Sequence, residues 1–183
     1  RIARRSRQLL PPYETTDTLT KLEQALEQTN PAKVICLGDS FDDLQAGQSL
    51  TEDHTLWITR LMAGREWVWI EGNHDPGPVA LGGCHLAELS QAPLTFRHIA
   101  QDSGKAEVSG HYHPKASLQI KGRSISRAAF LVDQDRLIMP AYGTYTGGLR
   151  SDASILCDLM QEDAIALVTG PQVYAVPMPR KSK

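Results

Sequence analysis

The sequence predicts an α/β protein in which two packed, mixed β-sheets are flanked by helices. In the first half, short β-branched apolar runs alternate with segments whose apolar residues have helical spacing, which is typical of a parallel sheet with crossover helices. In the second half, apolar runs follow one another with only turn residues between them, which favours a mixed or antiparallel sheet. The 183 residues, 41% of them hydrophobic, predict a single domain over residues 1–183.

The first half is expected to contain two helices and two strands. In the first helix, apolar residues stand at positions 19, 22, 25 and 26, after a cap at Thr15 or Thr16 and before the stop at Asn30-Pro31. A second helix carries Trp57 and Leu61 and ends near Gly64. In order, we expect a helix that includes Asp17 to Leu26, a strand from Lys33 to Leu37, a helix from about Thr51 to Ala63 and a strand from Glu66 to Ile70.

The second half is expected to be built of strands that are separated by turns. Turn residues such as Lys121-Gly122-Arg123 and Asp133-Gln134-Asp135 separate them. The terminal pair is predicted to form a hairpin around Gly170-Pro171. The expected strands span residues 94–98, 106–109, 117–120, 125–132, 136–139, 164–169 and 173–176.

Composition excludes a strongly charged nucleic-acid or membrane-surface protein. The formal net charge is −2, so there is no overall pull toward a polyanion. No segment has the length or hydropathy of a membrane span or a signal peptide. Cys36, Cys84 and Cys157 are far apart and lack a CxxC spacing, which favours reduced thiols and a cytoplasmic location, with Cys36 as a small core residue.

Metal-binding side chains follow the predicted strands in three places. Glycines Gly38 and Gly72 allow sharp turns at the ends of the first two strands, where ligands of parallel sheets gather. In a regular strand, residues two apart share a face, so both imidazoles of the His-Tyr-His run can point into one site. The candidate residues are Asp39 and Asp42, Asn73 and His74, and His111 and His113.

Each motif alone has an ordinary structural explanation. Asp39 and Asp42 can cap a turn and the next helix, His111 and His113 can be surface residues, and Gly-Asn-His-Asp can be a plain turn. Their coincidence at three strand ends favours a site for divalent metal ions, because carboxylate, amide and imidazole are suitable ligands.

The order Gly-Asp-x-x-Asp, Gly-Asn-His-Asp, an isolated His and Gly-His-x-His, from Gly38 to His113, resembles the calcineurin-like metallophosphoesterases. That family has a four-layer α/β/β/α sandwich. Three further runs resemble a bacterial branch that is associated with a DNA ligase and a helicase in DNA repair. These runs are residues 8–13 (QLLPPY), 81–83 (LGG) and 140–149 (PAYGTYTGGL).

The resemblance implies a role for each motif residue. Asp39 would bridge two metal ions, and His74, oriented by Asp42, would stabilise the transition state or protonate the leaving oxygen. The family also uses a lone histidine as a ligand of the second metal, for which His98 is our candidate and His85 the alternative. The metal ligands are then Asp39, with Asn73, His98 and His111 on the second metal and His113 on the first.

One family motif has no match in this sequence. The Asp-x-His of the first strand, which supplies the remaining ligands of the first metal, does not occur before Gly38. We expect it to lie upstream of Arg1; the alternative is a degenerate member of the family.

The expected function is binuclear metal-dependent hydrolysis of phosphodiester bonds, with DNA as the substrate, alongside a DNA ligase and a helicase. Mn²⁺ is the expected metal, with Fe, Zn²⁺ or Ni²⁺ as alternatives. A homodimer is compatible with the sequence, and no membrane partner is expected. The alternatives are a small-molecule phosphodiesterase or phosphomonoesterase, and an inactive binding subunit of a repair complex. Tyr142 and Tyr145 can stack on a base or belong to the core of a packed turn.

Overall fold

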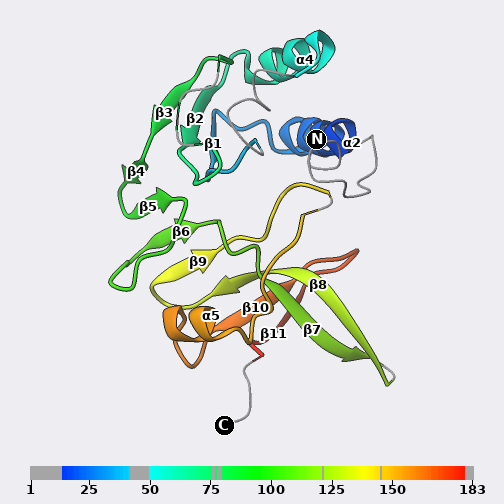
Figure 1. The fold of residues 1–183 in the computed structure, drawn as a ribbon, viewed down its shortest axis with the longest axis vertical. Helices are drawn as coiled ribbons and strands as arrows, with labels where there is room; N and C mark the ends of the chain where they lie inside the picture. Colours follow the sequence, from blue (N-terminus) through cyan, green and yellow to red (C-terminus); the bar gives the residue numbers. More distant parts are fainter. Residues whose placement is uncertain are drawn as a thin grey trace. The chain divides into compact units, whose positions relative to one another are not determined.

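The computed structural model describes residues 14–41, 50–75, 77, 80–120, 122–144 and 146–179. The chain divides into two compact units (Figure 1). The first consists of the chain up to Glu88 together with residues 142–145, and the second of residues 89–141 and the chain from 146 on. Each unit contains one β-sheet and at least one helix, which confirms the predicted α/β class with two sheets.

The first unit is a parallel three-stranded sheet with two helices. The strand order is β1-β2-β3, and both pairings are parallel, as the alternation of strands and helices predicted. The predicted helices and strands of this half are confirmed, with ends that differ by a few residues. The elements are α2 (Glu14–Thr29), β1 (Lys33–Cys36), α4 (Glu52–Met62), β2 (Glu66–Ile70) and β3 (Cys84–Leu86).

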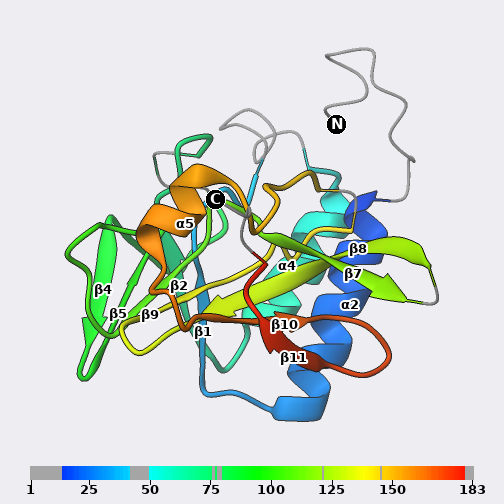
Figure 2. The same ribbon diagram turned by 90° about the horizontal axis from the view of Figure 1, so that it is seen from below.

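The core of the first unit lies between the sheet and its helices. Both helices lie on the same side of the sheet (Figures 1 and 2). Leu26 of α2 and Leu61 of α4 pack against Trp67 and Trp69, which point to one face of β2 because they are two residues apart. Cys36 packs against this cluster as predicted, and burial raises the pKa of its thiol to about 12.

The second unit is built on a mixed sheet in the order β11-β10-β8-β9-β6-β5-β4, with β7 paired to β8. The pairs β5–β6 and β6–β9 are parallel, and β8 pairs antiparallel with β7, β9 and β10. The strands are β4 (Glu88–Gln91), β5 (Leu94–Arg97), β6 (Glu107–Ser109), β7 (Lys115–Ile120), β8 (Arg123–Val132), β9 (Arg136–Ile138), β10 (Ile165–Val168) and β11 (Tyr174–Pro177). The predicted terminal hairpin is confirmed by the antiparallel pairing of β10 and β11.

Two short elements of this unit were not predicted. Strand β4 has four residues, and helix α5 (Ser154–Leu159) has six, which is too short to show helical periodicity in the sequence. Leu156 of α5 nevertheless completes the core of the second unit, where it joins Leu131 and Ile138, and all three side chains are fully buried.

The strand order sets where the candidate residues lie within each unit. Asp39 follows β1, and Asn73 follows the neighbouring parallel strand β2. In the second unit, His98 directly follows β5, and His111 follows its parallel neighbour β6 after Gly110. The carboxyl ends of parallel strands share one edge of a sheet, so each unit gathers its own group of candidate residues. Among the helices of the described ranges, none has the length and hydropathy to cross a membrane.

Candidate metal centre

In the first unit, the loop that carries Asp39 is held by the carboxylate of Asp75. The backbone N–H groups of Asp39, Ser40 and Phe41 all donate to this carboxylate, at 2.8, 2.7 and 3.3 Å. The N–H of Gly72 donates to it as well, at 3.1 Å. One buried side chain thus accepts four backbone N–H groups from the ends of two neighbouring strands. This network fixes the backbone of Asp39, which has a left-handed φ of 50°.

A reciprocal hydrogen bond orients the Asp39 side chain. The backbone N–H of His74 donates to Oδ1 of Asp39 at 2.8 Å. The two loops approach so closely that a Cβ on Gly72 would lie 2.2 Å from both the N and Oδ1 of Asp39. Only glycine fits at this position, so the Gly-Asn-His-Asp motif is needed to build the loop.

Asp75 is a residue to which the sequence analysis gave no role. Its side chain is only 6% exposed, and burial outweighs its N–H donors, so the pKa of the Asp75 carboxyl is raised. A buried carboxylate needs several hydrogen bonds to offset its desolvation, and the four N–H groups supply them. The sequence signal that could have identified Asp75 is its place at the end of the Gly-Asn-His-Asp motif, directly after the candidate residues Asn73 and His74.

In the second unit, His98 and His111 form a close pair. Nε2 of His98 lies 3.1 Å from Nδ1 of His111, and the rings meet edge to face with centroids 4.9 Å apart. His98 is 5% exposed. Two nitrogen atoms on one metal ion at ~2.0–2.1 Å are about 2.9–3.4 Å apart at octahedral or tetrahedral angles. The separation and the chemistry of this pair therefore fit a shared metal ion.

Backbone contacts hold this pair in register. The N–H of Gly110 donates to the carbonyl oxygen of His98 at 3.0 Å, which ties the ends of β5 and β6 together. His85, the alternative lone histidine, belongs to the first unit and stacks on Trp69 with the rings 18° from parallel. It lies in the short strand β3, where its side chain is partly buried.

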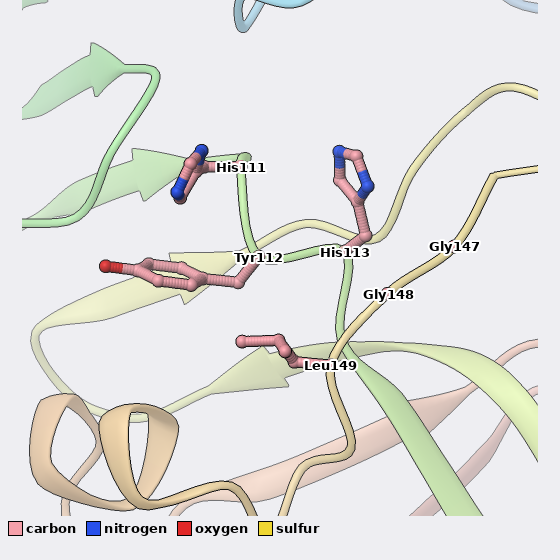
Figure 3. Close-up of a pocket in the computed structure, with 6 residues that line it drawn as sticks. All are labelled: His111, Tyr112, His113, Gly147, Gly148 and Leu149. Carbon is pink, nitrogen blue, oxygen red and sulfur yellow. The ribbon is translucent and has the colours of Figure 1, made fainter. Parts of the chain in front are cut away.

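His111 and His113 do not lie in a regular strand, so the alternation of a strand does not place their side chains. His111 and His113 have left-handed φ values of 62° and 47°, and β7 begins only at Lys115. A sequence does not reveal left-handed conformations of residues other than glycine, because they are imposed by the surrounding structure. In Figure 3 the ring of His111 projects to the left of the loop, beside Tyr112, and the ring of His113 projects upward.

A second segment of the chain supports the histidine loop. The N–H of Leu149 donates to the carbonyl oxygen of Tyr112 at 3.0 Å, and the N–H of Lys115 donates back to Leu149 at 2.7 Å. A Cβ on Gly148 would lie 2.0 Å from the carbonyl oxygen of His113. Figure 3 shows the open pocket of about 370 Å³ that the two segments line. Its lining residues are His111, Tyr112, His113, Gly147, Gly148 and Leu149.

Residues 12–152 match the family model described as calcineurin-like phosphoesterase. The chain belongs to this family. It is also similar to a crystal structure of nuclease MPE from Pseudomonas putida, with 25% sequence identity and a TM-score of 0.75, over 92% of this chain and 82% of that one. A comparison with curated protein sequences gave no match. The metallophosphoesterase sandwich fold and a metal-dependent phosphoester hydrolase activity follow from the family.

The remaining candidate residues of this phosphoesterase are placed as follows. Asn73 and His74 are exposed on the loop after β2, and Asp42 lies outside the described residues. Tyr142, whose ring is 42% exposed, is covered by the Lys21 ammonium group 4.2 Å from its centroid, and Tyr145 lies outside the described residues. The ligand and catalytic roles assigned to these side chains stay predictions.

Replacing Asp75 with alanine is expected to destabilise the phosphoesterase and to weaken its metal binding. The substitution leaves four backbone N–H groups without their acceptor, and hydrogen bonds to a charged group are worth ~1.5–3 kcal/mol each. We expect a loss of at least about 3 kcal/mol in the free energy of unfolding. Denaturant unfolding and calorimetric Mn²⁺ titration measure the two effects, with the exposed Glu71→Ala as the control. Wild-type stability and metal affinity in Asp75→Ala would contradict the role given to this carboxylate.

Gly148 and Gly147 form a matched pair for testing the support of the histidine loop. Gly148→Ala should displace His113, because the new methyl group would overlap its carbonyl oxygen. Gly147→Ala should be tolerated, since no atom lies within 4 Å of a Cβ at that position. We expect Gly148→Ala alone to lower hydrolysis of a chromogenic phosphodiester, by up to ~10²-fold for a displacement of His113 by about 1 Å. Equal activity of the two variants would show that this contact does not position the histidine.

Proposed function

We propose that this phosphoesterase hydrolyses phosphodiester bonds of DNA and acts in DNA repair alongside a DNA ligase and a helicase. The observation that carries the hydrolytic part is the His98–His111 pair, whose nitrogen atoms are 3.1 Å apart at the ends of adjacent parallel strands. Similarity to a nuclease supports DNA as the substrate. The partnership with a ligase and a helicase rests on the resemblance of residues 8–13, 81–83 and 140–149 to one bacterial branch.

The proposed metal ligands are those that the resemblance to the family implies. Asp39 would serve both ions, Asn73, His98 and His111 would hold the second, and His113 would hold the first. Hard oxygen ligands together with imidazoles favour Mn²⁺, Fe or Zn²⁺, and we propose Mn²⁺. When bound, the ions supply Lewis-acid activation of water and of the phosphoryl group.

The protein's own contribution is orientation and proton transfer. The N–H of His74 holds the Asp39 carboxylate in one orientation, so the ligand is positioned before a metal binds. The imidazole of His74 is exposed on the same loop, and we assign it the protonation of the leaving oxygen. General-acid assistance of this kind is worth ~10²–10⁴-fold in rate.

Variants of the two motif residues separate metal binding from proton transfer. His74→Ala keeps the backbone N–H that holds Asp39, so it should retain its metal and lose ~10²–10⁴-fold in kcat. Asp39→Ala should lose both metal and activity. Metal analysis and Mn²⁺-dependent hydrolysis of bis-p-nitrophenyl phosphate measure these effects. Full activity with unchanged metal content in either variant would contradict the role assigned to the residue that it replaces.

DNA cleavage distinguishes the proposed substrate from its alternatives. A nuclease should cut DNA in the presence of Mn²⁺ and stop when EDTA removes the metal. Hydrolysis of a small diester or monoester without any cleavage of DNA would identify a small-molecule enzyme instead. Absence of both activities in a metal-loaded protein would favour a binding subunit.

A further inference from the structure

The β7–β8 hairpin of the second unit combines positive charge with an absence of negative charge. From His111 to Val132 the sequence contains no Asp or Glu. The same stretch contains Lys115, Lys121, Arg123 and Arg127, of which Lys121 lies outside the described residues. In a chain with a net charge of −2, this is a local departure from the overall balance.

The hairpin extends beyond the sheet that carries it. Residues 129–132 of β8 pair with β10, whereas residues 123–128 pair with β7. Both views show the tip of this ribbon reaching past the other strands of the second unit (Figures 1 and 2). Arg123, Ser124, Ser126 and Arg127 of this part of β8 are exposed, whereas Ala116 of β7 is fully buried and Leu118 packs against the core.

Two exposed arginines follow the buried residues on one face of β8. Ala129 and Leu131 are fully buried in the core of the second unit. Arg123 and Arg127 lie on the same face of the strand, because all four positions differ by even numbers. Both arginines are exposed. The face that is apolar inside the unit thus carries two cations on the projecting ribbon, one on either side of the half-buried Ile125.

These two arginines differ from the others in the described ranges. Arg60, Arg97 and Arg150 form ion pairs with Glu23, Glu107 and Asp152, respectively. Arg65 and Arg136 donate to backbone carbonyl groups. Within the described ranges, no carboxylate lies within ion-pair distance of Arg123 or Arg127. Their guanidinium groups are available to an external anion, whereas the other arginines that the structure describes have internal partners.

We propose that this ribbon, defined by Arg123 and Arg127, binds the phosphate backbone of the DNA substrate outside the reaction centre. This inference rests on the proposed function and adds a DNA-binding surface to the proposed nuclease. Arginine binds phosphate through paired N–H groups, and two cations on one face match a polyanion rather than a single phosphate.

The spacing along the ribbon supports a backbone contact. Arg127 lies opposite Ala116, three residues after His113, and Arg123 lies opposite Ile120. At ~3.3 Å per residue, the two arginines are about 13 Å apart along the strand, which corresponds to about four nucleotide steps of duplex DNA. The ribbon begins two residues after a proposed metal ligand, so a strand that occupies the centre can continue along it.

The test is the salt dependence of DNA binding, measured in EDTA so that no cleavage occurs. The probe is a short DNA duplex, titrated by fluorescence anisotropy between ~50 and 200 mM salt. Removing both charges in Arg123→Gln/Arg127→Gln should lower the slope of log K against log salt by about 2, one unit per lost phosphate contact. Arg123→Lys/Arg127→Lys should keep most of the slope, because the charges remain.

The matched control removes two positive charges elsewhere. Arg60→Gln/Arg150→Gln changes the net charge by the same amount at arginines already paired with carboxylates, and its slope should stay near that of the wild type. Thermal unfolding confirms that each variant is folded. Equal slopes for the two glutamine double variants, or no binding of DNA by the wild type, would overturn the ribbon proposal. Mn²⁺-dependent diester hydrolysis by the wild type is a separate readout, so the proposed function can stand or fall independently.

Discussion

The close approach of two backbone loops around the carboxylate of Asp75 is the constraint on which the first unit's candidate ligands depend. Four N–H groups converge on this side chain, and one of them belongs to Asp39 itself. The His74 N–H in turn fixes the Asp39 carboxylate. Gly72 makes this approach possible, because any side chain there would overlap Asp39. Hydrogen bonds to a charged acceptor are strong and directional, so the buried carboxylate of Asp75 positions the candidate ligand Asp39.

In the second unit, the ends of two adjacent strands position the candidate residues His98 and His111. Adjacent parallel strands end beside each other, and a single backbone hydrogen bond from Gly110 to His98 brings the two imidazoles to 3.1 Å. His111 and His113 adopt left-handed conformations that β7 and the 146–150 segment hold in place. Strain in such residues persists only where surrounding contacts determine it, and it is found at functional sites. The same loop leads directly into the β7–β8 ribbon, so one stretch of chain joins a proposed metal ligand to a proposed substrate surface.

Much of this could be predicted from the sequence. Periodicity identified both helices and the parallel strands of the first unit, and the motifs after the strands identified Asp39, Asn73 and His111. His98 was chosen over His85 on position alone, and the pairing of its ring with His111 is the contact that a shared ligand role requires.

Asp75 was missed because its role depends on N–H groups 34 to 36 positions away in sequence, which no local pattern shows. The left-handed histidines and helix α5 depend likewise on tertiary contacts, from the Gly148 segment and from the core around Leu156.

Metal stoichiometry tests the central claim most directly, because every proposed role depends on bound ions. The measurement is the metal content of the full-length protein purified with Mn²⁺, combined with its turnover of bis-p-nitrophenyl phosphate before and after chelation. The account predicts two ions per chain, turnover that is lost in EDTA and turnover that returns with Mn²⁺. A folded protein that binds no metal, or one whose turnover is indifferent to chelation, would contradict it.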